Sequence, residues 1–361
     1  MPNLQRVLLG ALCAIASFTA ASAEIDYPSA VPDRRIEFPR DEGSHPDFKT
    51  EWWYLTGWLE SENGDTFGFQ VTFFRHRPGT DEDNPSRFAA RQLLFAHASL
   101  SDPRSGRLLR DEKTARVGFG LAEAREGAMD VHIDDWRLRR EPAATKIETR
   151  VASAEFAFEL QLDVAQAPLL QGRNGFSQKG PSQVSASHYY SLPQLGATGR
   201  VIVGERSYQV RGTAWLDHEW FSSVLDEQAR GWDWAGLNFN DGSALMVFRM
   251  RNAAGERHWA DATLRDTQGN TRSFSPEQVQ WRALRKWRSA RTGVEYPVEW
   301  EVKVGERTLK LRPLMDDQEN DARGSTGTLY WEGAVRAYDE SGREIGRGYL
   351  ELTGYGDPID F

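Results

Sequence analysis

The sequence predicts an all-β protein made of two barrel-like or curved-sheet units. Apolar and polar residues alternate through many short segments that glycine-containing turns separate, which is typical of antiparallel strands and hairpins. Thirteen tryptophans and eighteen phenylalanines supply the large side chains of a β-rich core, of an aromatic-lined cavity, or of both. Three segments also recur in the same order in the two halves, which indicates duplication of one unit.

The first strong strand is predicted at residues 51–59. Trp53 and Leu55 lie on one face of this strand, and Trp52 and Tyr54 lie on the other, because side chains alternate along an extended chain. Neither face is purely polar. We therefore expect the strand to be covered on both sides.

The duplicated segments share a plan of strand, glycine turn and strand, and one pair also shares a closing arginine. If the copies fold alike, each half forms its own β-rich unit. The matched segments are 53–75 with 233–251, 96–106 with 259–269, and 198–217 with 332–353. These matches predict two domains, at 24–221 and 222–361.

The N-terminal 23 residues have the pattern of a cleavable signal peptide, with an apolar run at 7–16 and a small-x-small site at 21–23. The run is too short to span a membrane, and no later apolar stretch is long enough. Cys13 is the only cysteine, so the mature chain is expected to have no disulfide or thiol chemistry. We expect a periplasmic or secreted protein without a transmembrane segment.

The formal net charge of −9 becomes more negative by one when Arg6 is removed with the signal peptide. Such a charge disfavours nucleic acid or an anionic membrane surface as the main partner.

The candidate site is the stretch 212–239, where ionisable groups stand among indoles. Burial next to aromatic rings can shift pKa values strongly, and functional sites often use such shifts. The ionisable residues are Asp217, His218, Glu219 and Asp233, and the tryptophans are Trp215, Trp220, Trp232 and Trp234.

Alternation divides this stretch into two faces. His218 and Trp220 continue the apolar face of Ala214 and Leu216 towards a barrel mouth, where His218 could carry a proton near neutral pH. Asp217 and Glu219 point the other way unless the strand bulges. A structural histidine bonded to a backbone carbonyl is the alternative. The second copy is expected to carry Leu-Thr-Gly (352–354) at the position of Leu-Asp-His (216–218), so the polar group is expected only in the first copy.

Asp233 shares a predicted face with Ala235 and Leu237. Desolvation there would raise the pKa of its carboxyl and allow general-acid catalysis. Pairing with an arginine or with backbone N–H groups is the alternative, and Glu51 has the same ambiguity.

Motifs for a nucleophile elbow, a P-loop, a dinucleotide fold or a zinc protease are absent from the sequence. The seven histidines are dispersed without metal-ligand spacing, so no metal and no cofactor are expected. A metal site that joins His97, His188 and His218 in space is the weaker alternative.

Several long motifs together resemble the AttH family, which is also described as lipocalin-like or carotenoid 1,2-hydratase-like and whose members are often labelled predicted secreted hydrolases. The resemblance implies two tandem lipocalin-like (calycin) β-barrel domains and covers nearly all the mature chain. Its relatives include carotenoid hydratases, a secreted hydratase of plant phenolics, and fungal cyclases that bind substrate between the domains. The motifs are EWWYLTGWL (51–59), HASLSD (97–102), YYSLPQL (189–195), GTAWLDHEW (212–220), GWDWAGLNF (231–239) and GYLELTGY (348–355).

In the carotenoid hydratases an essential His-x-Trp pair matches His218 and Trp220. Their Tyr-x-Asp is missing here, since the comparable strand reads Val-Phe-Arg-Met (247–250), and Asp233 is the candidate replacement. The resemblance implies hydratase or hydrolase chemistry on a hydrophobic lipid or isoprenoid held between the barrels. The aromatic residues expected to bind it are Trp52, Trp53, Tyr54, Tyr190, Trp215, Trp232 and Trp234.

Two other functions stay open. The first is a non-catalytic periplasmic carrier of a lipid or small molecule that serves an ABC-type export system, because fold alone does not establish chemistry. The second is a structural envelope protein, which would carry no ligand.

Overall fold

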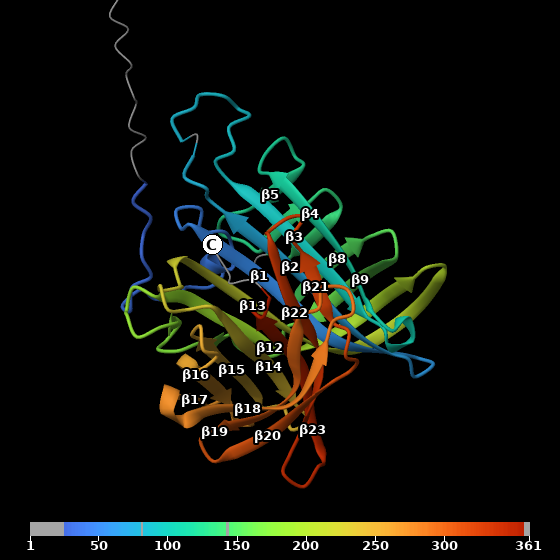
Figure 1. Cartoon of the computed structure of the whole chain (residues 1–361). Helices are drawn as coiled ribbons and strands as arrows, with labels where there is room; N and C mark the ends of the chain where they lie inside the picture. Colours follow the sequence, from blue (N-terminus) through green and yellow to red (C-terminus); the bar gives the residue numbers. More distant parts are fainter. Residues whose placement is uncertain (1–24, 81, 142–143, 357–361) are drawn as a thin grey trace, which may run out of the picture.

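The computed structural model describes residues 25–80, 82–141 and 144–356, and these residues form two antiparallel sheets with three short 3-10 turns (Figure 1). The predicted signal peptide and Cys13 lie outside the described residues. None of the described helical segments has the length and apolar character needed to cross a membrane.

The first sheet, called the first barrel below, contains β1 to β13. They are β1 (Thr50–Ser61), β2 (Thr66–His76), β3 (Leu93–Ser101), β4 (Leu108–Arg116), β5 (Ala122–Ala124), β6 (Asp130–Ile133), β7 (Trp136–Arg139), β8 (Lys146–Ala152), β9 (Phe156–Asp163), β10 (Leu169–Leu170), β11 (Phe176–Gln178), β12 (Ala186–Val203) and β13 (Arg206–Ser223). The 3-10 turns η1 (Arg40–Glu42) and η2 (Pro103–Ser105) accompany this sheet.

The second sheet, called the second barrel, contains β14 to β23. They are β14 (Gly231–Phe239), β15 (Ala244–Arg251), β16 (Arg257–Arg265), β17 (Thr271–Phe274), β18 (Val279–Arg288), β19 (Glu295–Val304), β20 (Arg307–Pro313), β21 (Glu319–Ala322), β22 (Thr328–Tyr338) and β23 (Glu344–Thr353). The turn η3 (Pro276–Gln278) precedes β18.

The strand orders of the two sheets correspond. The first runs β4-β3-β2-β1-β13-β12-β9-β8-β7-β6-β5, and its order up to β7 corresponds to that of the second, which runs β17-β16-β15-β14-β23-β22-β20-β19-β18. In each sheet the opening hairpin pairs with the last strand of the same sheet, as β1 does with β13 and β14 with β23. This correspondence agrees with the duplication inferred from sequence.

The strand registers correct one detail of the duplication. Trp53 pairs with His218 in the first barrel, and Asp233 pairs with Leu352 in the second. With Trp53 aligned to Asp233, His218 corresponds to Leu352 and Asp217 corresponds to Glu351. The expected alignment of 216–218 with 352–354 was therefore wrong by two positions, and the second copy does carry a carboxyl group.

β1 is buried on both faces, as predicted. Leu55 and its alternate neighbours lie in the core inside the first barrel. Tyr54 and Trp58 point outwards into a second core that residues such as Trp234 and Tyr349 of the other barrel complete. The two barrels therefore pack through the outer faces of β1 and β13 on one side and of β14 and β23 on the other.

Direct bonds fix this packing. Trp58 Nε1 donates to the carbonyl of Gly348 at 2.8 Å, and Asn238 Nδ2 donates to the carbonyl of Ala214 at 3.0 Å. Gly68 allows the close approach, because a Cβ atom there would lie 2.6 Å from the Cβ atom of Ala334 in the second barrel. Figure 1 shows β22 of the second barrel running up beside β2 of the first.

Candidate functional site

Side chains near the end of β13 point alternately into two separate regions of the molecule. β13 pairs with β1 without a bulge from Thr50–Phe221 to Ser61–Val210, so alternation holds throughout. His218 and Trp220 point into the first barrel, whereas Asp217 and Glu219 point outwards to the space between the barrels. The expected division of the two faces is confirmed.

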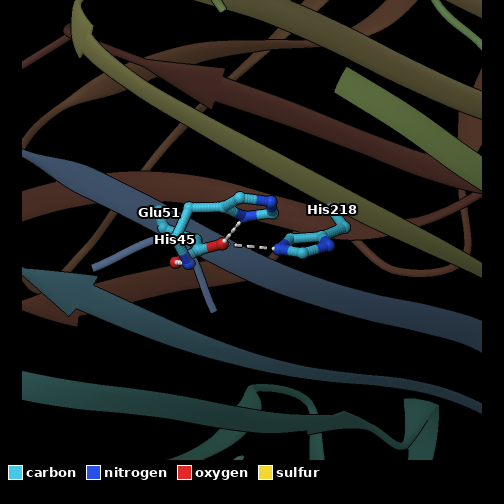
Figure 2. A group of neighbouring side chains, drawn as sticks. All are labelled: His45, Glu51 and His218. Carbon is cyan, nitrogen blue, oxygen red and sulfur yellow. Dashed lines mark hydrogen bonds and ion pairs between the residues drawn. The ribbon is translucent and has the colours of Figure 1, made fainter. Parts of the chain in front are cut away.

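Inside the first barrel, a carboxylate joins two histidines. Glu51 Oε1 lies 2.7 Å from Nδ1 of His45 and 2.8 Å from Nε2 of His218 (Figure 2). Its other oxygen, Oε2, accepts a bond of 2.9 Å from Nε of Arg75. Glu51 and His218 come from neighbouring strands, and His45 comes from the segment before β1, which folds over this end of the barrel.

Indole rings hold both imidazoles in place. The His218 ring stacks on Trp53 with centroids 4.6 Å apart, and the His45 ring stacks on Trp220 at 3.8 Å. Tyr190 meets His218 edge to face. Trp53, Tyr190, His218 and Trp220 are buried and His45 is nearly so, which strengthens the electrostatic interactions inside the cluster.

The charges in this cluster follow from competition between burial and pairing. Burial opposes ionisation of Glu51, but His45, His218 and Arg75 outweigh it and hold the pKa of Glu51 well below its usual range. Burial lowers the pKa of His45, yet Glu51 and Asp41 outweigh it and raise that pKa. For His218 burial is the stronger effect, and its pKa is lowered. Glu51 is therefore an anion, His45 is the histidine that favours a positive charge, and His218 favours its neutral form.

A cavity of about 300 Å³ lies between the two barrels. Aromatic and apolar side chains from both barrels form most of its wall, and this composition is typical of pockets for small organic ligands. The apolar wall includes Trp52, Tyr54, Phe74, Trp232, Trp234, Phe248 and Met250.

Asp217 is a buried acid on the first-barrel side of the cavity. Tyr189 donates its hydroxyl to Oδ2 at 2.7 Å, and Trp215 Nε1 donates to Oδ1 at 2.6 Å. Burial raises the pKa of Asp217 to about 7, although the bonds from Ser191, Tyr189 and Trp215 work against that rise. Near neutral pH, Asp217 is thus divided between an acid that can donate a proton and a base that can accept one.

Next to Asp217, Glu219 has a cationic partner. Lys179 Nζ lies 2.8 Å from Glu219 Oε1, and the same ammonium group lies over the rings of Tyr189 and Phe248, at 4.6 and 4.8 Å from their centroids. Lys179 therefore connects an acid of the first barrel with an aromatic side chain of the second.

Two carboxyl groups face the cavity from the second barrel. Glu332 of β22 and Glu351 of β23 are direct register partners. Burial raises the pKa of Glu351 to about 7, and the nearby charges of Asp217 and Glu219 raise it further, while Trp232 works against the rise. Burial and Glu351 raise the pKa of Glu332 well above its usual range. The interaction of Glu351 with Asp217 shows that acids of both barrels face the same space.

The predicted site residues fall into three places. The cavity is lined by Asp217, Glu219, Trp52, Tyr54, Trp232 and Trp234; the interior of the first barrel holds His218, Trp220, Trp53 and Tyr190; and Trp215 is buried between the barrels, where it bonds to Asp217.

Asp233 lies apart, inside the second barrel. Its carboxylate accepts bonds from Arg249 Nε at 2.6 Å and from the Tyr355 hydroxyl at 2.8 Å, and it lies 3.2 Å from Arg251 Nε. The expectation that Asp233 joins His218 in a cavity between the barrels is therefore wrong, because each points into its own barrel. The arginine pairing, which was the alternative, is what the structure contains.

The alternative cluster of His97, His188 and His218 does not form either. His97 faces the cavity and bonds to the Tyr330 hydroxyl at 2.8 Å, whereas His188 and His218 lie inside the barrel next to Trp220.

Several functional candidates escaped sequence reasoning. His45 lies in a proline-containing segment without periodicity, and Lys179 lies in a polar glycine-containing stretch, so neither had a pattern to place it. Glu351 was hidden by the misaligned copy. The alternation of Tyr349 and Glu351 in the last strand, compared with Trp215 and Asp217, was the signal that could have found it.

Residues 29–355 match the AttH-like family. The chain belongs to this family. A solved structure of a protein from Nitrosomonas europaea described as AttH is 48% identical, with a TM-score of 0.86 over 91% of this AttH-like chain and 99% of the other. No curated protein matches the sequence significantly.

Two more distant structures share the fold of the AttH-like chain. Kievitone hydratase from Nectria haematococca is 14% identical, with a TM-score of 0.70 over 92% of this chain and 96% of that one. CghA is 14% identical, with a TM-score of 0.55 over 93% and 96%. The fold expected from sequence, all-β with two tandem lipocalin-like barrels, is confirmed.

Proposed function

We propose that this AttH-like protein is a hydratase-type enzyme that acts on a small, largely apolar substrate bound between its two barrels. The observation that carries the proposal is a pair of buried carboxyl groups, Asp217 and Glu351, which face one apolar cavity from opposite barrels and whose pKa values are both about 7. Environments of this kind tune carboxyl groups for acid–base chemistry at neutral pH. The shared fold of kievitone hydratase, whose name states hydration, supports the same reaction class.

Asp217 is the proposed proton donor. Its proton would pass to one carbon of a substrate double bond, where a C–H bond forms and the π bond breaks. This leaves a carboxylate on Asp217 and a positive charge on the second carbon. The oxygen of water then bonds to that carbon, and the surplus proton of the water returns to Asp217. Dehydration is the same sequence in reverse.

The cavity walls suit the charge that develops. The ring faces of Trp232, Trp234 and Tyr54 can stabilise a cation through their quadrupoles. The carboxylates of Glu219 and Glu351 lie on opposite walls and are placed to orient the attacking water.

The substrate class follows from the lining. A cavity whose exposed surface is mainly aromatic and apolar favours a lipid-like, isoprenoid or phenolic molecule over a sugar or a nucleotide. The N-terminal sequence pattern supports a periplasmic or secreted location for the reaction.

A carrier function is the second candidate. The same apolar cavity could hold a ligand without changing it, as an accessory to an export system would require, and fold alone does not choose between the two.

Ligand analysis separates the candidates. Wild-type and Asp217→Asn proteins would be purified from cells, and the organic extract of each would be compared by mass spectrometry. A hydratase predicts a ligand in the variant and, in the wild type, a product that differs from it by one water. A carrier predicts the same unchanged ligand in both. A Met250→Trp variant, which fills the cavity, is the control that shows where the ligand binds.

A further inference from the structure

The cluster inside the first barrel is separate from the cavity and has the composition of a metal site. His45 Nδ1, Glu51 Oε1 and His218 Nε2 all lie within 4.8 Å of one another, and all three residues are buried (Figure 2). Two imidazoles and one carboxylate are the protein ligands of several catalytic zinc sites.

The geometry needs only a small adjustment to admit an ion. Zinc binds nitrogen and oxygen at about 2.0–2.2 Å, so ligand atoms around it are separated by roughly 3.4 Å in a tetrahedral arrangement. Glu51 Oε1 lies 2.7 Å from one imidazole nitrogen and 2.8 Å from the other. A small rotation of the carboxylate would open this space.

The outer contacts are those that metal-binding histidines have. The other nitrogen of His45, Nε2, lies 3.1 Å from Asp41 Oδ1, and Nδ1 of His218 lies 3.2 Å from the Tyr190 hydroxyl. In metal sites an oxygen partner of this kind fixes the tautomer and turns the lone pair of the first nitrogen towards the metal.

Glu51 is oriented in the same manner. Its Oε2 atom accepts from Arg75 Nε at 2.9 Å, from Ser44 Oγ at 3.2 Å and from the His45 amide at 2.8 Å. The cationic guanidinium therefore holds the far oxygen and leaves Oε1 directed at the two imidazoles.

An independent observation comes from His188 and Trp220, on strands β12 and β13. Both are wholly buried, and neither the two ring nitrogens of His188 nor Nε1 of Trp220 has a hydrogen-bond partner within the described part of the chain. The Trp220 ring stacks on His45 and lies 5.6 Å from His188. Buried polar groups without partners favour a further polar occupant beside the cluster.

We infer that His45, Glu51 and His218 bind a divalent transition-metal ion, with zinc as the best-fitting class for this mixed nitrogen and oxygen set. Because His45 belongs to the segment before β1, the ion would tie this segment to β1 and β13 and so close the end of the first barrel.

The test is metal stoichiometry in the intact mature protein. Protein treated with a chelator would be dialysed against zinc or cobalt(II), and bound metal would be measured by elemental analysis and by the visible absorption of tetrahedral cobalt. We expect about one ion per chain. His97→Gln, which alters a buried histidine outside the cluster, should bind the same amount.

Three variants define the site. Glu51→Gln and His218→Gln should lose the ion, and Asp41→Asn, which keeps all three ligands, should weaken binding by about 10–100-fold. Circular dichroism confirms that each variant is folded, and Asp41→Asn keeps the test open if the ligand variants unfold. Folded wild type that binds less than about a tenth of an equivalent, or equal loss in His97→Gln, would overturn the inference.

Discussion

The two barrels each bury a carboxylate near the same end of their opening strand, but they give it opposite partners. Glu51 lies between two histidines, with one arginine on its far oxygen. Asp233, on the corresponding strand of the second barrel, is held by two arginines and a tyrosine. Arginine stays protonated and binds no metal, whereas histidine can release a proton or coordinate an ion. The interior of the first barrel therefore holds groups that can exchange protons or bind an ion, whereas the interior of the second holds a fixed cluster of ion pairs.

The outer faces of the two barrels, by contrast, carry the same kind of group. Asp217 and Glu351 occupy corresponding positions of the last strands, and both point into the cavity. Here the copies have kept the same kind of group, so the cavity has an acid on each wall. The duplication thus supplied two similar walls to one shared space, while the two interiors diverged.

The largest expected effect is a loss of turnover when Asp217, on the first-barrel side of the cavity, is replaced. Asp217→Asn removes the proposed proton donor but keeps its shape, so kcat should fall by about 10²–10⁴-fold. Steady-state kinetics on the ligand identified by mass spectrometry would measure this loss. Asp339→Asn, at an exposed hairpin turn, is the matched control and should be fully active. An Asp217→Asn enzyme with normal kcat would remove Asp217 from the mechanism.

Replacing the buried carboxylate of the second barrel should lower the stability of the protein and leave its turnover unchanged. Asp233→Asn leaves buried Arg251 and partly buried Arg249 without their anion, which should cost about 3–5 kcal/mol. Urea unfolding followed by tryptophan fluorescence would measure the change. Protein that remains folded should keep its kcat. If kcat falls as it does in Asp217→Asn, the two barrels do not differ as described.

The acid pair should make stability depend on pH. The pKa of Asp217 rises from 3.8 to about 7 on folding, and that of Glu351 rises from 4.5 to about 7. A raised pKa means that the folded state binds the proton more tightly, and each tenfold gain in proton affinity contributes about 1.4 kcal/mol of stability. This stabilisation is complete below about pH 4 and is lost as pH rises to about 7.

Thermal unfolding would detect this dependence. Buried His97 and His188 have lowered pKa values and oppose this trend, so the comparison is made between two proteins. From pH 8 to pH 5.5, the Tm of wild type should change more favourably than the Tm of Asp217→Asn. Equal changes in the two proteins would show that Asp217 is ionised in the folded state. Below about pH 4.5 the trend should reverse, because Asp41 and Glu51 have lowered pKa values.

The smallest effect is expected when the hydrogen bond between Trp232 and Glu351, on the second-barrel side of the cavity, is removed. Trp232 Nε1 donates to Glu351 Oε2 at 3.1 Å and lowers the pKa of that carboxyl. Trp232→Phe should cost about 1 kcal/mol of stability and move the acid limb of the pH–rate profile to higher pH, because the Glu351 carboxylate that orients the water would become protonated at higher pH. An unchanged limb would indicate that Glu351 does not control the rate.

Sequence patterns predicted the fold and some residues of each region: Asp217 and Glu219 at the cavity, and His218 and Trp220 inside the first barrel. Period-two alternation placed Asp217 and Glu219 opposite His218 and Trp220, because the strand has no bulge there. It could not place His45, whose position depends on how an irregular segment folds back over the barrel. It also could not pair Glu51 with His218, 167 residues away, since sheet register between distant strands is set by tertiary packing.

The unbroken register of β13 with β1 makes this strand a wall shared by two compartments. A substitution scan along residues 215–220 should therefore give two interleaved phenotypes, with one set of positions altering the cavity and the other altering the closed end of the barrel. Inserting a single residue would exchange the two sets at once. Substitutions can change either compartment separately, but the length of this strand is constrained by both.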